Sequence, residues 1–314
     1  MGVDTFQLLP PSDAGDAHVH ILPIAFDGTV CGRKGTRAAP EAILAASADL
    51  EYYDEACGWS PFEHLLVHVA PLLDCGTHDA PVDVDRQITE RAALLQQDLD
   101  MSEGRPRLLI GLGGEHSITP SLTAAALPHP GTVVVFDAHA DLRQTYQGNG
   151  FSHATTVYRL REQGHRALLI GVRSMTNHEA ARIETDREIS CHTADSLHSD
   201  EIVQRLQREL SSLSGPIWIS LDCDGFDPSV IPSVGTPQPG GLSWHFVMRC
   251  LYDIFNAPEA DVKGLDVVEM IPDPLGVSQT AAAKLVFKCI SLWGYANTLH
   301  HLPKAGSQTR VTWE

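Results

Sequence analysis

The sequence predicts an α/β protein, a three-layer α/β/α sandwich around a central, mainly parallel sheet. Short apolar runs alternate with amphipathic segments along the whole chain, and the runs are continuously apolar. Continuous apolar runs suit parallel strands that are buried on both faces. Strands that alternate with helices place helices on both sides of such a sheet.

The strands are expected at residues 19–23, 65–69, 107–112, 132–136, 168–172, 217–221 and 262–267. A helix is expected over residues 200–213, because its apolar residues share one face. Residues 278–299 predict a second, long helix. No repeat or obvious linker interrupts the pattern, and 314 residues suit one large domain, so we expect a single domain over residues 1–314.

The formal net charge is -18, which argues against nucleic acid or an anionic membrane as a partner. Such acidity would attract a cationic substrate, but it is also what keeps many proteins in solution. The N-terminal residues lack a basic segment followed by a long apolar run, so no secretory signal is expected. The longest apolar stretches, such as residues 132–136, are too short to span a bilayer.

The seven cysteines are scattered, and none forms a C-x-x-C pair. This spacing indicates reduced thiols and a cytoplasmic protein, and it argues against a disulfide framework or a zinc site.

Acidic residues and histidines follow the predicted strands. Asp137, His139 and Asp141 come directly after the run TVVVF. In an extended backbone, residues two apart point the same way, so these side chains are expected to converge. Two carboxylates and an imidazole on one side favour a bound cation. A lone Asp-x-Asp at a strand end often only caps a turn or helix.

Two further strands end in the same kind of residue. PIWISL runs into Asp222 and Asp224, and RLLIGL runs into Gly113-Gly114-Glu115 followed by His116. Because parallel strands deliver their carboxyl ends to one edge, the three segments together predict one site. The ligands exceed the needs of one metal, and oxygen-rich sites with some imidazole suit Mn²⁺. The sequence therefore predicts a hydrolase with two metal ions that activate water.

At these residues the sequence resembles the ureohydrolase family of arginases, agmatinases and related guanidino hydrolases, with agmatinase-type members nearest. The resemblance covers nearly the whole chain. The matching segments are GGEHS (113–117), DAHAD (137–141), SHAT (152–155), SLDCDGFDPS (220–229), GTPQPGGLSW (235–244) and VVEMIP (267–272), with residues 26–43 resembling the family's N-terminal substrate-side loop.

The resemblance implies an arginase-like fold with about eight parallel strands, assembled into homotrimers or homohexamers. It implies one metal site made by His116, Asp137, Asp141 and Asp222. It implies a second made by Asp137, His139, Asp222 and Asp224, with two divalent ions, Mn²⁺ first and Ni²⁺ or Co²⁺ as alternatives.

The resemblance also implies the catalytic residues. Glu269 would hold the guanidinium group, and His153 would relay protons. The chemistry of the reaction adds Asp141, which would accept a proton from the tetrahedral intermediate and pass it to the leaving nitrogen. Substrate contacts are assigned to Glu269, His153 and Asn149, the last within the glycine-rich loop before His153. The expected reaction releases urea and an amine or ammonia.

The substrate is less constrained by the sequence. Arginases carry an aspartate where this chain has Ser174, which disfavours arginine and leaves agmatine as the leading substrate. Gln144, Thr145 and Gln238 stand where many agmatinase-type members have acids. Free guanidine and a guanidino acid such as guanidinobutyrate are therefore alternatives, and Arg143 or Arg173 would serve a carboxylate.

Two other classes of protein are alternatives to a guanidino hydrolase. A two-metal phosphoesterase would leave Glu269 and His153 without a role, and the sequence has no basic cluster for phosphate. A non-enzymatic member of the family would not need every proposed ligand, yet all are present.

Overall fold

The computed structural model describes residues 5–76, 79–100, 106–128 and 130–302. Its sheet has nine strands in the order β2-β1-β4-β9-β8-β5-β6-β7, with β3 beside β1, and every pairing is parallel. The strands are β1 (Val19–Ala25), β2 (Val67–Val69), β3 (Leu73–Asp74), β4 (Leu108–Leu112), β5 (Thr132–Phe136), β6 (Arg166–Val172), β7 (Ile189–Thr193), β8 (Ser214–Asp222) and β9 (Glu259–Val268).

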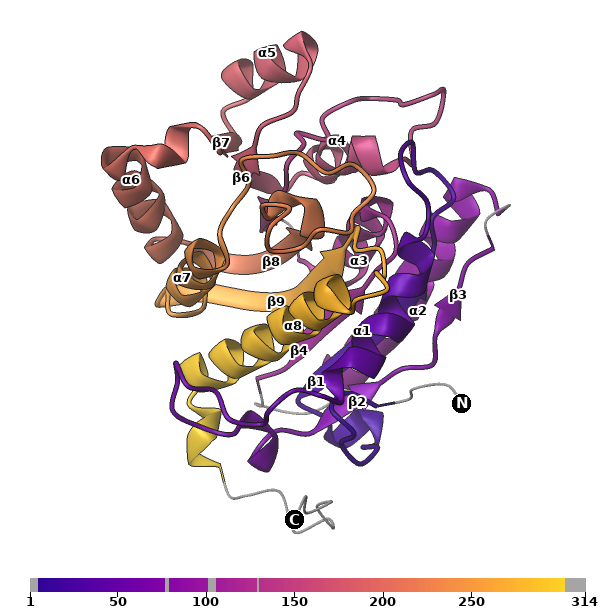
Figure 1. The fold of residues 1–314 in the computed structure, drawn as a ribbon, viewed down its shortest axis with the longest axis vertical. Helices are drawn as coiled ribbons and strands as arrows, with labels where there is room; N and C mark the ends of the chain where they lie inside the picture. Colours follow the sequence, from indigo (N-terminus) through magenta and orange to yellow (C-terminus); the bar gives the residue numbers. More distant parts are fainter. Residues whose placement is uncertain (1–4, 77–78, 101–105, 129, 303–314) are drawn as a thin grey trace.

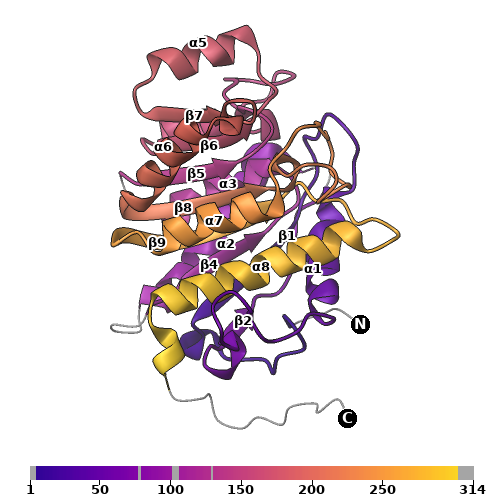
Figure 2. The same cartoon turned by 60° about the vertical axis from the view of Figure 1, so that its left-hand side comes forward.

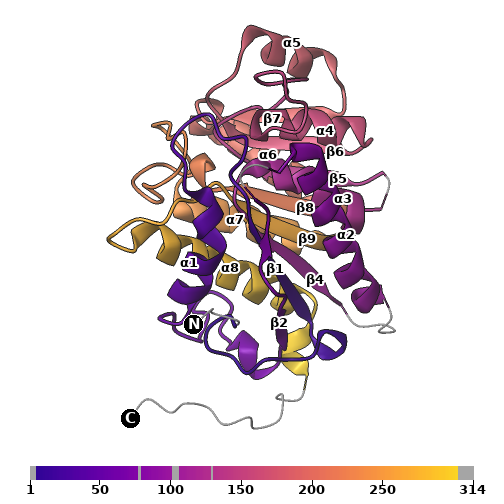
Figure 3. The ribbon, with the colours of Figure 1, turned by 90° about the vertical axis from the view of Figure 1, so that its right-hand side faces the viewer.

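Helices cover both faces of this sheet, as the alternation of elements predicts (Figure 1). One layer contains α1 (Ala39–Ser47), α6 (Asp200–Ser211), α7 (Trp244–Phe255) and α8 (Val277–Ala296). The opposite layer contains α2 (Pro81–Asp100), α3 (Thr119–Ala126) and α4 (Thr156–Glu162). Figure 2 shows α7 and α8 in front of the sheet, and Figure 3 shows α1 and α8 on one side with α2, α3 and α4 on the other. α5 (Asn177–Thr185) packs beside β7 at the end of the sheet.

Residues along one strand alternate between the two halves of the core. In β5, Val134 and Phe136 belong to the cluster under α7 and α8, whereas Val133 and Val135 belong to the cluster under α3 and α4. Both faces of the strand are therefore buried, which explains the continuous apolar run.

The predicted elements are confirmed, with differences at the edges of the sheet. The resemblance implied about eight strands, and the described residues form nine, because β3 contributes two residues beside β1. The pattern missed β7, whose sequence ISCHT mixes polar and apolar residues since it lies at the sheet edge. The helix expected over 278–299 ends at Ala296.

No helix in the described part of the chain combines the length and the apolar character that a membrane span requires.

Candidate metal centre and active site

Four neighbouring strands carry the candidate site at their carboxyl ends. His116 follows β4, Glu269 follows β9, Asp222 ends β8 and Asp137 follows β5. These strands are consecutive in the sheet, in the order β4-β9-β8-β5. Residues from positions far apart in the chain are therefore brought to one place, where parallel α/β sheets bind their ligands.

Tight turns orient the carboxylates. Oδ1 of Asp137 accepts the backbone N–H of His139 at 2.6 Å, and Oδ1 of Asp222 accepts the backbone N–H of Asp224 at 2.7 Å. These are side-chain-to-backbone turns of the kind that aspartate favours. The extended backbone expected from the sequence is replaced by a turn after β5 and a 3₁₀ helix at Cys223–Gly225. Each turn uses one carboxylate oxygen and leaves the other for the site.

The free oxygens and the imidazoles form two groups that share one residue. His116, Asp137 and Asp222 make the first group, and Asp137, His139 and Asp224 make the second. Nδ1 of His116 lies 3.1 Å from Oδ2 of Asp137 and 3.2 Å from Oδ2 of Asp222. Nδ1 of His139 lies 3.1 Å from Oδ2 of Asp224. Asp137 therefore stands between two positions suited to a cation.

Asp141 adds a further carboxylate to the first group. Its Oδ2 lies 3.2 Å from Nδ1 of His116. Its backbone φ of 48° lies in the left-handed region, which residues other than glycine seldom adopt. Strained backbone of this kind concentrates at functional sites, where the surrounding structure holds it.

A chain of hydrogen bonds sets the tautomer of His116. Oγ of Ser220 donates to Oδ1 of Asp266 at 2.6 Å and therefore offers a lone pair to Nε2 of His116 at 2.9 Å. Nε2 carries the proton, and Nδ1 turns its lone pair toward the carboxylates. Sequence reasoning missed Asp266, although an aspartate inside the apolar run GLDVV is a signal of a buried polar role.

These donors fit a cation. Nδ1 of His116 and Oδ2 of Asp137 are buried, and neither has a hydrogen bond of acceptable geometry to the described residues. A nitrogen lone pair facing carboxylate oxygens is repulsive without a positive charge between them. Metal-ligating histidines usually donate their second ring N–H to a fixed acceptor, and Ser220, held by Asp266, is that acceptor here.

The pKa values reflect the same crowding of charge. Burial opposes the charged form of His139, yet Asp137 and Asp224 raise its pKa to about 12. Burial and the charge of Asp137 raise the pKa of Asp141 to about 7. His139 therefore holds a proton near pH 7, which a divalent metal ion would replace.

Gly114, two residues before His116, is explained by the close approach of another backbone segment and not by a positive φ. A Cβ on Gly114 would lie 1.8 Å from the carbonyl oxygen of Phe26. The loop after β1 therefore packs directly on the loop after β4, and any other residue would push the two apart.

Glu269 is a buried carboxylate beside the first group. Its Oε1 accepts the backbone N–H of His116 at 2.8 Å, and its φ is 62°. Burial, together with the negative charge of Glu115, raises its pKa well above the usual range. A bound cationic group would relieve this cluster of negative charge.

His153 opens a short 3₁₀ helix, His153–Thr155, which Ser152 caps. Burial and the neighbouring His116 and His139 lower the pKa of His153 to about 4, so it is neutral near pH 7. Asn149 lies in the turn before it, where its Oδ1 accepts the backbone N–H of Phe151 at 2.9 Å. Asn149 does not line the pocket described next, and its assignment to the substrate stays a prediction.

One cavity of about 180 Å³ joins these residues. We call it the central pocket. It is lined by the side chains of the site, His116, His139, Asp141, His153, Asp222, Asp224 and Glu269, and by a rim that includes Val30, Cys31, Arg143, Tyr146, Ser174, Met175 and Thr236.

Arg173 is fully engaged by the backbone. Its guanidinium group donates to the carbonyl oxygens of Gly171, Asp224, Gly225, Phe226 and Gln238. The sequence left Arg173 open as a partner for a substrate carboxylate. The structure gives it another role, because these bonds fasten the Asp224 turn to the loop around Gln238.

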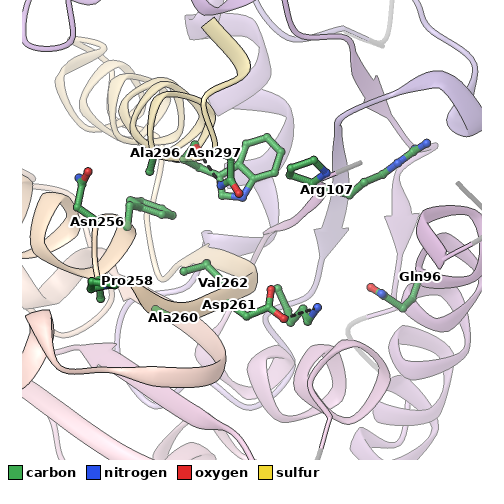
Figure 4. Close-up of a pocket in the computed structure, with 14 residues that line it drawn as sticks. Gln96, Arg107, Asn256, Pro258, Ala260, Asp261, Val262, Ala296 and Asn297 are labelled. Carbon is green, nitrogen blue, oxygen red and sulfur yellow. Dashed lines mark hydrogen bonds and ion pairs between the residues drawn. The ribbon is translucent and has the colours of Figure 1, made fainter. Parts of the chain in front are cut away.

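A larger cavity, of about 500 Å³, lies at the opposite end of β9 (Figure 4). Its charged side chains are already paired. Lys263 contacts Asp261 at 2.6 Å, and Arg107 donates to the carbonyl oxygen of Gly15 at 2.8 Å. Neither metal-binding group contributes to it, so the chemistry lies in the smaller, central pocket.

Known proteins match both the sequence and the fold. The profile of the arginase family matches residues 17–291. This chain belongs to the arginase family. The resemblance found in the sequence is thereby confirmed.

Several members of the arginase family are similar over nearly their full length. N(1)-aminopropylagmatine ureohydrolase from Synechocystis is 33% identical, covering 89% of this chain and 90% of that protein. Agmatinase from Pyrococcus horikoshii is 34% identical, covering 90% of this chain and 95% of that protein. The crystal structure of agmatine ureohydrolase from Thermoplasma volcanium superposes with a TM-score of 0.78 at 28% identity. The match covers 93% of this chain and 94% of that structure.

Arginase-family enzymes use a binuclear divalent metal site, for which this chain has the His and Asp groups described above. The protein is accordingly a hydrolase that acts on the C–N bond of a guanidino compound and releases urea and an amine.

Proposed function

We propose that this protein hydrolyses agmatine to urea and a diamine. The observation that carries the proposal is the position of Glu269. It is a buried carboxylate that lines the central pocket with members of both metal-binding groups and is hydrogen-bonded to the backbone of His116. A guanidinium group is planar and cationic, and it pairs with a carboxylate through two parallel hydrogen bonds.

The metal ions proposed for the two groups are Mn²⁺, because the donors are mainly carboxylate oxygens with one imidazole in each group. Ni²⁺ and Co²⁺ are the alternatives. Bound there, two divalent ions would lower the pKa of a shared water from about 15.7 toward about 7 and so supply the nucleophile.

The side chains of the pocket then have separate roles. Glu269 would hold the guanidinium group and aim its carbon at the attacking oxygen. Asp141 would accept a proton from the tetrahedral intermediate and return it to the leaving nitrogen. His153, neutral near pH 7, would exchange protons between the departing amine and solvent.

Two observations support agmatine as the substrate. Ser174 lines the central pocket at the position where arginases carry an acid, so an α-amino group would lack its partner. The rim contributes the apolar and aromatic side chains of Val30, Tyr146 and Met175, which suit a chain of methylene groups. The similarity to an agmatinase, at 34% identity, agrees with this substrate.

N(1)-aminopropylagmatine is a second candidate. It carries the same guanidinobutyl group with a longer amine tail, and the Synechocystis relative that is 33% identical is named for it. The pocket is open at its rim, so the longer tail would extend past Tyr146 and Met175 into solvent.

Urea release from Mn²⁺-loaded protein tests the proposal. The panel contains agmatine, N(1)-aminopropylagmatine, arginine, guanidinobutyrate and free guanidine, with a repeat in Ni²⁺. The expected result is the highest kcat/KM for agmatine and no urea from Asp137→Ala. A higher kcat/KM for guanidine or for guanidinobutyrate would overturn the choice of substrate.

The remaining assignments are also proposals. Homotrimers or homohexamers are expected from the resemblance to the family. A cytoplasmic location is supported by the seven cysteines, all of which are free thiols in the structure.

A further inference from the structure

Glu115 is a buried carboxylate that the reaction outlined above does not use. It immediately precedes His116, and its side chain accepts three hydrogen bonds. Oε2 accepts the backbone N–H of Thr29 at 2.7 Å. Oε1 accepts the hydroxyl of Ser117 at 2.5 Å and the hydroxyl of Thr29. The loop after β1, which contains Thr29, is therefore anchored to the loop after β4.

The hydroxyl oxygen of Thr29 also faces His153. Oγ1 lies 3.3 Å from the backbone nitrogen of His153 and 3.4 Å from its Nδ1. A hydroxyl has one hydrogen to donate and two lone pairs that accept. The hydrogen is used on Glu115, so toward His153 the oxygen can only accept, and it accepts the backbone N–H.

This arrangement selects one tautomer of the imidazole. Oγ of Ser152 is a second oxygen near Nδ1, at 3.2 Å. If Nδ1 carries the proton, it donates to both oxygens. If Nδ1 is unprotonated, Ser152 can still donate to it, but the lone pair of Thr29 then faces the lone pair of Nδ1. Only the Nδ1–H tautomer suits both neighbours.

We propose that Glu115 and Thr29 are positioning residues that hold His153 as its Nδ1–H tautomer, which leaves Nε2 as the basic nitrogen. The hydrogen bonds described for the ring all involve Nδ1, and His153 lines the central pocket. A general base with its proton on the wrong nitrogen cannot accept another in the required place. This inference rests on the proposed role of His153 in proton transfer.

Glu115→Gln should reverse the direction of the hydrogen bonds that run from His153 through Thr29 to residue 115, while the side chain keeps its shape. The amide oxygen must accept the backbone N–H of Thr29, so the amide NH₂ faces the Thr29 hydroxyl and donates to it. The freed hydroxyl hydrogen then points at Nδ1 of His153. We expect kcat to fall about 100-fold, the lower range for general acid–base catalysis, while KM stays within about threefold.

Three further variants separate orientation from packing. Thr29→Val removes the hydroxyl and should lower kcat as Glu115→Gln does. Thr29→Ser keeps the hydroxyl and should retain activity. Ser117→Ala is the matched control, because it removes a hydrogen bond to the same carboxylate oxygen without contacting His153. Equal loss of kcat in Thr29→Ser or in Ser117→Ala would overturn the proposal.

The tautomer itself is measured by ¹⁵N NMR of histidine-labelled protein loaded with diamagnetic Zn²⁺, with His153 assigned by comparison with His153→Asn. The wild type should show a protonated Nδ1 and an unprotonated Nε2, and Glu115→Gln should show the reverse. The proposal fails if the wild type carries its proton on Nε2, or if Glu115→Gln leaves the tautomer unchanged. This readout does not depend on urea, so it remains decisive even if every guanidino substrate tested is inert.

Discussion

The backbone N–H of His116 donates to the carboxylate of Glu269 at 2.8 Å. His116 belongs to the first metal-binding group, and Glu269 is the group proposed to hold the substrate. One residue thus contributes a side chain to the metal centre and a backbone donor to the substrate-binding carboxylate. This contact, together with the backbone hydrogen bond from the N–H of Glu269 to the carbonyl oxygen of Gly114 at 2.9 Å, fixes Glu269 relative to the first metal-binding group.

Glu269→Gln should lower kcat/KM for the preferred substrate at least about 100-fold, which corresponds to about 2.7 kcal/mol of transition-state stabilisation. The amide still fits the site but loses the charge that pairs with guanidinium. Metal content should stay at the wild-type value, measured by elemental analysis after desalting. Loss of metal together with activity would show that Glu269 supports the metal centre instead.

Asp137 and Asp224 should differ in their effect on metal binding. Asp137→Ala removes a ligand shared by both groups, whereas Asp224→Ala affects only the second group. Titration with Mn²⁺ should show two weakened sites in the first variant and one in the second. Identical titrations for the two variants would mean that Asp137 is not shared.

Asp266→Asn should weaken Mn²⁺ binding about 10- to 100-fold, although Asp266 is not a proposed ligand. It accepts from Ser220, which in turn fixes Nε2 of His116. Trp218→Phe is the control, because it removes another donor to Asp266, at 2.6 Å, and leaves the Ser220 contact in place. Similar affinity losses in both variants would point to general core damage.

Lys288→Met should destabilise the fold by about 3–5 kcal/mol, because it leaves the buried carboxylate of Asp54 without its partner at 2.9 Å. This pair lies between α8 and the loop after α1. Glu55→Gln is the matched control. Glu55 also contacts Lys288, but its side chain is 69% exposed, so its loss should change stability by less than about 1 kcal/mol. Urea unfolding measures both, and a stability loss in Glu55→Gln as large as that in Lys288→Met would contradict the assignment.

Local pattern alone predicted much of this protein. The continuous apolar runs predicted buried parallel strands, because a strand that is buried on both faces has apolar residues at consecutive positions. The spacing of Asp137 with His139, and of Asp222 with Asp224, predicted the ligand pairs. The geometry behind that spacing was different, because aspartate carboxylates bind backbone N–H groups two residues on and so form turns in place of extended backbone.

Other features depended on which strands are neighbours, and no local pattern contains that information. The insertion of β9 between β4 and β8 places Glu269 against His116, which is 153 positions away in the chain. The same strand order places Asp266 beside Ser220. It also lets Arg173 donate hydrogen bonds to the carbonyl groups around Asp224. The sequence by itself determined most of the strands, the paired spacing of the acidic residues and histidines, and the chemistry that this spacing favours, because these follow from neighbouring residues. Only the tertiary structure decided which distant residues meet, such as Glu269 with His116 and Asp266 with Ser220, because those contacts depend on the order of the strands.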